Sequence, residues 1–325
     1  MSGIKITGEN RLVLVTGRAH PALADEIASE LGTELTHTDA RTFASSEIYA
    51  RYDDSVRGSD AFVIQSHTRP INEWLMEQLI MVDALKRASA KRITVVAPYY
   101  PYARQDKKGR GREPISARLV ADLFKAAGAH RIMSVDLHAP QIQGFFDGPV
   151  DHLFAMPVLL KHFQEKLDPT TLTVVSPDMG RVKVADIWSE RLGAPLAIIH
   201  KRRDPRVMNE VSVHEIVGEV RGRVCLLVDD LIDTGRTIVK AAEALKAAGA
   251  LGVVVAATHA VFSDPAPEIL SNEFIDSVVV TDTLPLTEHQ KFPTLTVLPI
   301  APLIARAIHE VFDNGSVTSM FDGAA

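Results

Sequence analysis

The stretch RVCLLVDDLIDTGRTIVKAAEALKAAGA, residues 223–250, joins the pattern of a buried strand to that of a helix. Its apolar run, Val224 to Val228, leads into two adjacent carboxylates, Asp229 and Asp230, and small polar residues then open the helix. A strand followed at once by a helix is typical of the units that build parallel sheets. The acid pair at the end of the predicted strand raises the question of what it binds.

The same alternation of strand and helix patterns runs along the whole chain. Short β-branched runs such as RLVLVTG, RITVVAP and HRIMSVDL lie between helical stretches such as HPALADEIASELG. This order predicts an α/β fold with mainly parallel sheets and helices on both faces. The chain has 325 residues, which is the length of two ordinary domains.

Two internal similarities indicate that these domains are copies of one unit. KAAGAHRIMSVDLHA, residues 125–139, aligns without a gap with KAAGALGVVVAATHA, residues 246–260. LVLVTGRAHPALADEIASELG, residues 12–32, is similar to LTVVSPDMGRVKVADIWSERLG, residues 172–193. We therefore expect two tandem Rossmann-like domains related by internal duplication. Chance similarity between two α/β halves is the alternative.

The expected domains follow from these copies. We expect a first domain over residues 1–157, a second over residues 158–309, and a tail, residues 310–325, that packs back on the first. In the ungapped alignment, His259 is the counterpart of His138.

Composition limits the classes of function. A net charge of −6 makes the chain a poor non-specific binder of nucleic acid or membrane. The single cysteine, Cys225, excludes an intrachain disulfide and fits a reducing compartment. The N-terminus lacks the apolar core of a signal peptide, and no apolar run approaches membrane-spanning length. We expect a soluble cytoplasmic protein that binds neither nucleic acid nor membrane.

The turn DTGRT, residues 233–237, has the pattern of a monophosphate cradle. Backbone N–H groups, two threonine hydroxyls and the helix dipole all favour an anion there. Asp229 and Asp230 would repel that anion, so we expect them to accept hydrogen bonds from vicinal hydroxyls or to face a metal ion. A phosphate beside a cis-diol is a ribose 5-phosphate. The structural alternative is an ordinary turn with Asp233 as the helix N-cap, which leaves the acid pair unexplained.

Three further motifs carry candidate chemistry, and each has a plainer interpretation. YARQDKKGRGR, residues 102–112, crowds five cations into a predicted loop that is suited to a triphosphate, although basic loops are usually just solvated. His138 and Asp178 each end a predicted strand, where a lone histidine is more often structural than a metal ligand. IIHKRRDP, residues 198–205, places three cations in a predicted loop that is either solvated or catalytic.

The motifs together resemble a known family. VDDLIDTGRT resembles the phosphoribosyl-diphosphate-binding loop of the phosphoribosyltransferase fold. DSVRGSDAFVIQS, REPISARLVADL, VDLHAPQIQGFFDGPVDHL and VSPDMGRVKVA are similar to segments of ribose-phosphate pyrophosphokinases, and the resemblance runs from about residue 12 to Phe321. It implies transfer of the diphosphoryl group of MgATP to O1 of ribose 5-phosphate, giving 5-phosphoribosyl 1-diphosphate and AMP for nucleotide biosynthesis.

The resemblance also implies roles for particular residues. The residues implied to be catalytic, over the transferring phosphorus, are Lys201 and Arg203. Those implied to bind ATP are Phe43, Ser45, Glu47, Arg104 and Gln105. Those implied to hold Mg²⁺ are His138 and Asp178. Those implied to bind ribose 5-phosphate are Asp229, Asp230, Asp233, Thr234, Gly235, Arg236 and Thr237. Those implied to build a regulatory site are Ser55, Arg57, Ser316 and Thr318.

The family further implies a homo-oligomer, commonly a hexamer, in which a neighbouring subunit supplies the adenine-contacting loop. It also implies inorganic phosphate as an activator and ADP as an inhibitor. Two departures stand out: Ser45 and Ser46 replace the usual Asp/Asn-Gly pair of the adenine loop, and Arg236 stands where the phosphate loop usually has glycine. A phosphoribosyltransferase, a catalytically silent regulatory subunit and a phosphoribosyl-binding RNA regulator are the alternatives.

Overall fold

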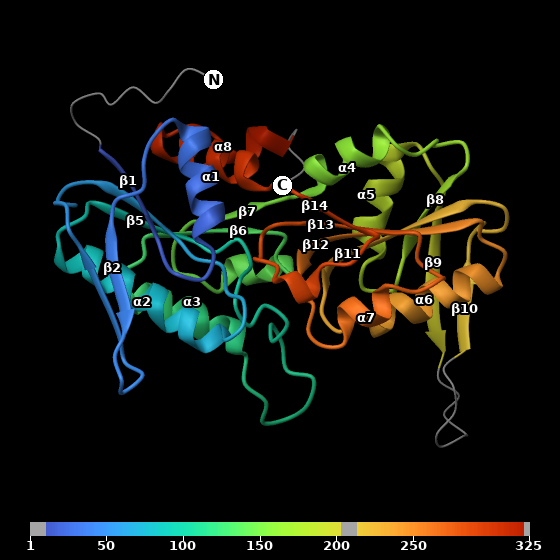
Figure 1. The fold of residues 1–325 in the computed structure, drawn as a ribbon, viewed down its shortest axis with the longest axis horizontal. Helices are drawn as coiled ribbons and strands as arrows, with labels where there is room; N and C mark the ends of the chain where they lie inside the picture. Colours follow the sequence, from blue (N-terminus) through green and yellow to red (C-terminus); the bar gives the residue numbers. More distant parts are fainter. Residues whose placement is uncertain (1–10, 203–212, 322–325) are drawn as a thin grey trace. The chain divides into compact units, whose positions relative to one another are not determined.

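The computed structural model describes residues 11–202 and 213–321, and these form two compact units, each with its own sheet (Figure 1). The first unit comprises the residues up to Ala155, Thr283–Pro285 and the residues from Pro299 onward. The second comprises Met156–Asp282 and Leu286–Leu298. The predicted α/β class with mainly parallel sheets is confirmed.

Within the described residues, the first unit has a five-stranded sheet in the order β1-β4-β5-β6-β7, with parallel neighbours throughout. A separate antiparallel hairpin is formed by β2 and β3. The elements of this unit are β1 (Leu12–Thr16), α1 (Pro21–Leu31), β2 (Thr38–Thr42), β3 (Ile48–Tyr52), β4 (Asp60–Ile64), α2 (Ile71–Arg87), β5 (Arg92–Val96), α3 (Ser116–Ala127), β6 (Arg131–Val135), η1 (Pro140–Gly144), β7 (Val150–Leu153), α8 (Ala301–Phe312) and η3 (Val317–Phe321).

The second unit has a seven-stranded sheet among the described residues, in the order β10-β9-β8-β11-β12-β13-β14. The β9–β10 pair is antiparallel, and the other neighbours are parallel. The elements of this unit are α4 (Met156–Gln164), β8 (Leu172–Ser176), α5 (Val182–Leu192), β9 (Leu196–Arg202), β10 (Val213–Val217), β11 (Val224–Ile232), α6 (Arg236–Ala247), β12 (Gly252–Ala260), α7 (Ala266–Leu270), β13 (Ser277–Thr281), η2 (Glu288–Gln290) and β14 (Leu295–Leu298).

The two units share one order of elements along the chain, which identifies the equivalent strands, although the hairpin joins the main sheet only in the second unit. In both, a strand and a helix lead to an antiparallel hairpin, and four more parallel strands follow: β1-β4-β5-β6-β7 corresponds to β8-β11-β12-β13-β14. The similarity of residues 12–32 to 172–193 therefore pairs equivalent elements. Both segments end their helix at a left-handed glycine, Gly32 and Gly193, with φ of 65° and 63°.

The ungapped match of residues 125–139 to 246–260 is out of register by one strand. It pairs β6 with β12, whereas the sheet order makes β5 the counterpart of β12. The reason is that a helix, a glycine and a buried strand recur in each βα unit. Local sequence similarity therefore identifies the type of unit, but it does not show which strand of the sheet the unit forms. His259, in β12, is therefore not the counterpart of His138.

The last helix of each half belongs to the other unit. Helix α8 follows β14 but packs on α1 in the first unit, and α4 follows β7 but packs on α5 in the second. The chain returns to the first unit at Pro299, and the boundary expected after residue 309 lies inside α8.

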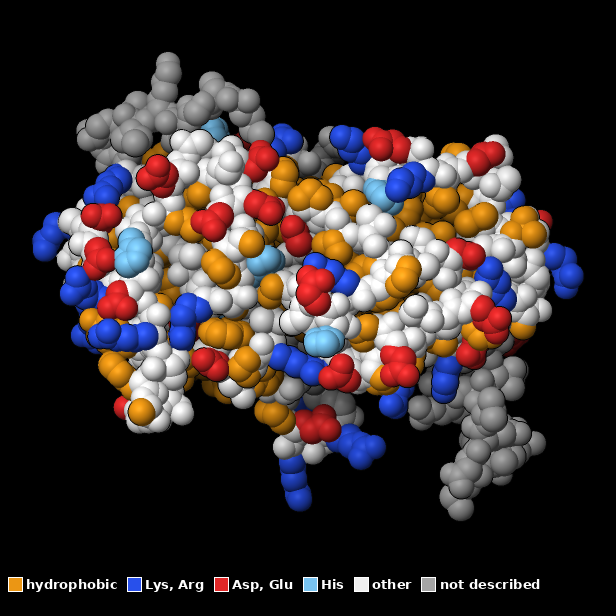
Figure 2. Space-filling model, in the orientation of Figure 1, with side chains coloured by type: hydrophobic (Ala, Val, Ile, Leu, Met, Phe, Trp, Pro, Cys, Tyr) orange, Lys and Arg blue, Asp and Glu red, His pale blue; other side chains and the backbone are white. Residues whose placement is uncertain are grey.

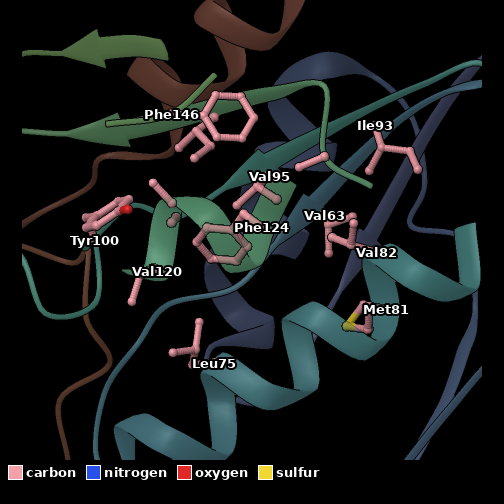
Figure 3. Packing of buried hydrophobic residues seen from close by; sticks show 14 of the residues in the cluster. Val63, Leu75, Met81, Val82, Ile93, Val95, Tyr100, Val120, Phe124 and Phe146 are labelled. Atoms are coloured by element: carbon pink, nitrogen blue, oxygen red, sulfur yellow. The ribbon is translucent and has the colours of Figure 1, made fainter. Parts of the chain in front are cut away.

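One hydrophobic cluster of the first unit lies between its sheet and the helices α2 and α3 (Figure 3). Phe124 of α3 is fully buried and packs edge-on against Tyr100, with ring centroids 6.5 Å apart. Val63 of β4 is drawn beside Val82 of α2, Val95 of β5 beside Phe124, and all belong to one buried cluster. These apolar residues recur with a period of two on the strands and with helical spacing on α2 and α3, which explains why the elements form here.

The surface gives two further observations. On the face drawn in Figure 2, acidic and basic side chains are interspersed over both units. Among the described residues, no helix has both the length and the apolar composition needed to cross a membrane.

Candidate functional site

The acid pair lies inside β11 and not beyond its end. The apolar run predicted a strand that stops at Val228, but β11 continues to Ile232. Its pairing with β12 extends to Ile232, whereas its pairing with β8 ends at Leu227. Asp229 and Asp230 therefore lie where β11 has separated from β8, beside the loop that leads from β8 to α5. This is the carboxyl end of a parallel sheet, where α/β folds place ligands.

Arg181 contacts both carboxylates of the pair. Its Nε lies 3.2 Å from Oδ1 of Asp229, and its Nη2 forms an ion pair with Oδ1 of Asp230. The backbone N–H of Asp230 donates to Oδ1 of Asp229 at 2.9 Å. Burial raises the pKa of Asp229 above its usual range, the neighbouring Asp230 charge adds to this rise, and Arg181 opposes it. Sequence reasoning missed Arg181, because one arginine before a helix carries no distinguishing pattern.

The turn after β11 opens directly into α6. Gly235 is the N-cap residue, with φ of 72°, so the alternative in which Asp233 caps the helix is wrong. Because glycine has no side chain, the first N–H groups of α6 receive no acceptor from their own cap residue. A Cβ at this position would lie 3.1 Å from Leu270 of α7. Arg236, the first residue of α6, is exposed.

Asp178 organises the loop between β8 and α5. It lies two residues beyond the end of β8, and its Oδ1 accepts hydrogen bonds from the backbone N–H groups of Gly180 and Arg181 at 2.8 and 3.1 Å. The hydroxyl of Ser176 donates to the Asp178 carbonyl at 2.7 Å. Asp178 therefore fixes the backbone from which Arg181 reaches the acid pair.

In the first unit, the candidate ATP residues Arg104 and Gln105 follow β5. The backbone carbonyl of Gln105 accepts from the N–H of Ala117, and its Oε1 accepts from the Ser116 hydroxyl at 2.6 Å, which ties it to the start of α3. Arg104 is exposed. The buried Asp106 accepts from the side chain of Gln141 at 2.7 Å, in the segment that follows His138.

His138 lies three residues beyond β6 and is half-buried, so it follows the strand and does not end it. The preceding backbone N–H, of Leu137, donates to Nε2 of His152 at 2.9 Å. The Asp106–Gln141 hydrogen bond joins the candidate ATP loop to the segment that follows His138, at the carboxyl ends of β5 and β6.

The candidate adenine loop is the turn between β2 and β3. The backbone N–H of Phe43 donates to the Glu47 carbonyl at 2.8 Å, and the Ser45 hydroxyl donates to Oε2 of Glu47 at 2.7 Å. Ser46 has φ of 70°, in the region that favours glycine. Phe43 is 46% exposed.

The predicted catalytic cations lie at the limit of what the structure describes. Strand β9 extends to Arg202, so the backbone of Lys201 is in a strand that pairs with β10, where the sequence had predicted a loop. The side chain of Lys201 and the whole of Arg203 lie outside the described residues. In chain order β9 and β10 correspond to β2 and β3 of the first unit, but β9 pairs with β8 and so joins the main sheet, whereas β2 and β3 form a separate hairpin.

The candidate regulatory residues belong to the first unit. Ser55 and Arg57 line a pocket of about 340 Å³ together with Arg51 and Asp54. Ser316 and Thr318 are exposed residues of the segment that leads into and through η3.

The first unit has no open acid pair at the corresponding place among its described residues. The strand registers put Gln65 and Ser66 at the positions of Asp229 and Asp230. Gln65 instead donates to Glu77, a carboxylate with no exposed surface, at 3.0 Å.

The guanidinium of Arg18 closes this network by binding Glu77 through Nε at 2.6 Å. A Cβ at Gly17 would lie 2.3 Å from the Gln65 side chain, so the corner is filled. Among the described residues, the acid pair beside a glycine-capped helix therefore has no counterpart at the equivalent place in the first unit.

The residues present suit a Mg²⁺ ion that is bound mainly through substrate phosphates. The carboxylate of Asp178 offers hard oxygen, the kind of ligand that Mg²⁺ prefers. Among the described residues, no group of three His, Cys, Asp or Glu side chains is arranged to hold an ion by itself. This fits an ion that takes one or two protein ligands and completes its shell with substrate phosphates and water.

Comparison with known proteins assigns the family. A model of the N-terminal domain of ribose phosphate pyrophosphokinase matches residues 12–128, and a model of the phosphoribosyl synthetase-associated domain matches residues 205–322. A curated ribose-phosphate pyrophosphokinase of Streptomyces coelicolor is 62% identical over 322 residues, which are 99% of each chain. The chain belongs to the ribose-phosphate pyrophosphokinase family.

Other members of the ribose-phosphate pyrophosphokinase family give the same result. The curated member from Mycobacterium tuberculosis is 58% identical over 97% of both chains. The crystal structure of phosphoribosylpyrophosphate synthetase from Mycobacterium smegmatis superposes with a TM-score of 0.88 at 57% identity, and the match covers 94% of this chain and all of that one.

Proposed function

We propose that this chain transfers the diphosphoryl group of ATP to O1 of ribose 5-phosphate, which yields 5-phosphoribosyl 1-diphosphate and AMP. The observation that carries the proposal is the acid pair of β11 beside the glycine-capped start of α6. Together they offer acceptors for two sugar hydroxyls and donors for a phosphate within one turn of chain. Full-length relatives named ribose-phosphate pyrophosphokinase support it.

In this reaction O1 attacks the β-phosphorus of ATP, and the bond from that phosphorus to the α,β-bridging oxygen breaks. AMP leaves with the bridging oxygen, and O1 releases its proton. The turn of residues 233–237 holds the 5-phosphate, and Asp229 and Asp230 accept the ribose hydroxyls. Lys201 and Arg203 stabilise the charge on the transferring phosphate groups.

The remaining roles belong to the first unit and to Asp178. Arg104 and Gln105 bind the ATP phosphates, and the Phe43 turn binds adenine in a neighbouring subunit. His138 and Asp178 would hold Mg²⁺, which neutralises phosphate charge when bound. The homohexamer, activation by inorganic phosphate, inhibition by ADP and a cytoplasmic location stay predictions.

Two alternatives are weaker. A phosphoribosyltransferase that consumes phosphoribosyl diphosphate would share the β11–α6 turn but has no use for a second α/β unit with a basic loop. A silent regulatory subunit would not need the acid pair, the phosphate turn and the family's catalytic cations together, although the Ser45–Ser46 substitution is compatible with it.

The test is a product assay. Purified protein is mixed with ATP, Mg²⁺ and inorganic phosphate, with and without ribose 5-phosphate, and AMP is measured by chromatography. We expect AMP only when the sugar phosphate is present. If GTP and CTP also give no product while ribose 5-phosphate still binds, the regulatory-subunit alternative replaces the proposal.

A further inference from the structure

Arg181 contacts both carboxylates of the acid pair, and no role has yet been given to it. Its guanidinium reaches Asp229 through Nε at 3.2 Å and Asp230 through Nη2. The three side chains are 15%, 20% and 7% exposed, so the cluster is largely shielded from water. Ion pairs in such surroundings are screened less than pairs on the surface.

The chain holds Arg181 in place from its own backbone. Asp178 accepts the N–H of Arg181 at 3.1 Å, and Arg181 is the N-cap residue of α5, with φ of −100°. The side chain therefore starts from a fixed point on the loop after β8. That loop faces the part of β11 that no longer pairs with β8.

The acid pair needs a cation to keep one arrangement. Two adjacent carboxylates with little exposure repel each other, and either can turn away from its neighbour. A guanidinium offers several N–H donors in a rigid plane, so one side chain can fix an oxygen of each carboxylate. An ammonium is a point charge and would restore the charge balance without the geometry. A carboxylate oxygen can accept more than one hydrogen bond, so contact with the guanidinium does not exhaust either side chain as an acceptor.

We propose that Arg181 is a positioning residue of the sugar site, which holds Asp229 and Asp230 in the arrangement that accepts the vicinal hydroxyls of ribose 5-phosphate. The inference rests on the proposed function. Arg181 would not contact the sugar itself. It would influence recognition of the sugar hydroxyls by orienting the two carboxylates.

The test measures binding and not turnover. Ribose 5-phosphate and 2-deoxyribose 5-phosphate are titrated calorimetrically into the full chain without ATP, for wild type, Arg181→Ala, Arg181→Lys and the control Arg191→Ala. Arg191 is exposed and lies at the other end of α5. We expect Arg181→Ala to raise the Kd of ribose 5-phosphate about tenfold or more, since it removes the guanidinium that both carboxylates contact.

The deoxy sugar tests recognition of the vicinal hydroxyls directly, because it lacks one of them. In wild type it should bind more weakly than ribose 5-phosphate, and in Arg181→Ala the ratio of the two Kd values should fall toward one. Arg181→Lys should restore part of the ribose 5-phosphate affinity, and Arg191→Ala should match wild type. A change confined to folding would weaken both ligands alike and leave their ratio unchanged.

Several results would overturn the inference. They are an unchanged Kd in Arg181→Ala, a parallel loss for both sugars, and tighter binding, which would mean that the guanidinium competes with the sugar. If wild type binds no ribose 5-phosphate, the proposed function fails and the inference fails with it. If wild type binds the sugar and forms AMP while Arg181→Ala is unaffected, only the inference fails.

Discussion

Ser46 occupies the left-handed region in the turn between β2 and β3, a backbone conformation that favours glycine. A serine there carries a Cβ penalty of about 1 kcal/mol. We expect Ser46→Gly to raise the free energy of unfolding by about that amount, measured by urea denaturation. Ser45→Gly is the control and should lower it, since it removes the hydrogen bond to Glu47. An unchanged urea midpoint in Ser46→Gly would contradict this prediction and would show that Ser46 carries no backbone strain.

Lys201 is the residue on which the proposed transfer depends most. If its ammonium acts in the transition state, Lys201→Ala should lower kcat a hundredfold or more, about 3 kcal/mol, with a much smaller rise in KM. Steady-state kinetics with both substrates measures this. An unchanged kcat would remove Lys201 from the mechanism.

His67 should make stability depend on pH. It is 1% exposed, and burial lowers its pKa to about 4 from an ordinary value near 6.5. Between these pH values the unfolded chain therefore binds more protons than the folded one. The contribution of the buried, neutral His67 to the free energy of unfolding is fully present above pH 6.5, and about 3 kcal/mol is lost as the pH falls toward 4. We expect the free energy of unfolding of His67→Asn, measured by urea denaturation, to fall less steeply than that of wild type between pH 6.5 and pH 4. Identical slopes would contradict the burial.

At the scale of elements, the turn between β11 and α6 depends on Gly235. Gly235→Ala would force a Cβ into positive φ and to within 3.1 Å of Leu270. We expect a loss of about 1 to 2 kcal/mol in unfolding free energy and at least a tenfold weaker affinity for ribose 5-phosphate, measured by calorimetry. Gly193→Ala also sits at positive φ, but nothing lies within 4 Å of its Cβ, so it should cost stability alone. Equal sugar affinities in the two variants would exclude the turn from the site.

The sequence predicted individual helices and strands well, but it predicted the pairing of strands and the contacts between elements poorly. An apolar run followed by two acids predicted β11 and its carboxylates, because burial and charge are local properties. The four extra residues of β11 could not be predicted, since they depend on pairing with β12. Arg181 was missed for a similar reason, because its meaning comes from the contact with β11. The one-strand error in the repeat arose because each βα unit has the same local pattern.

For the whole molecule, the assignment of α8 to the first unit has a consequence for stability. Ile308 of α8 is fully buried, and α8 packs on α1. We expect Ile308→Ala to cost about 2 to 5 kcal/mol and to speed amide hydrogen exchange in α1 more than in β13 and β14, which precede α8 in sequence. Val297→Ala, at a half-exposed position of β14, is the control. Faster exchange confined to β13 and β14 would contradict the assignment.

The central claim is that a diphosphoryl group, and not a single phosphoryl group, is transferred to the sugar. ³¹P NMR of the protein with MgATP, inorganic phosphate and ribose 5-phosphate follows every phosphorus in one sample. We predict equal amounts of AMP and of a diphosphate bound to C1 of the sugar, with the 5-phosphate intact. Formation of ADP with a sugar monophosphate at C1, or ATP that stays unchanged beside bound ribose 5-phosphate, would contradict the claim.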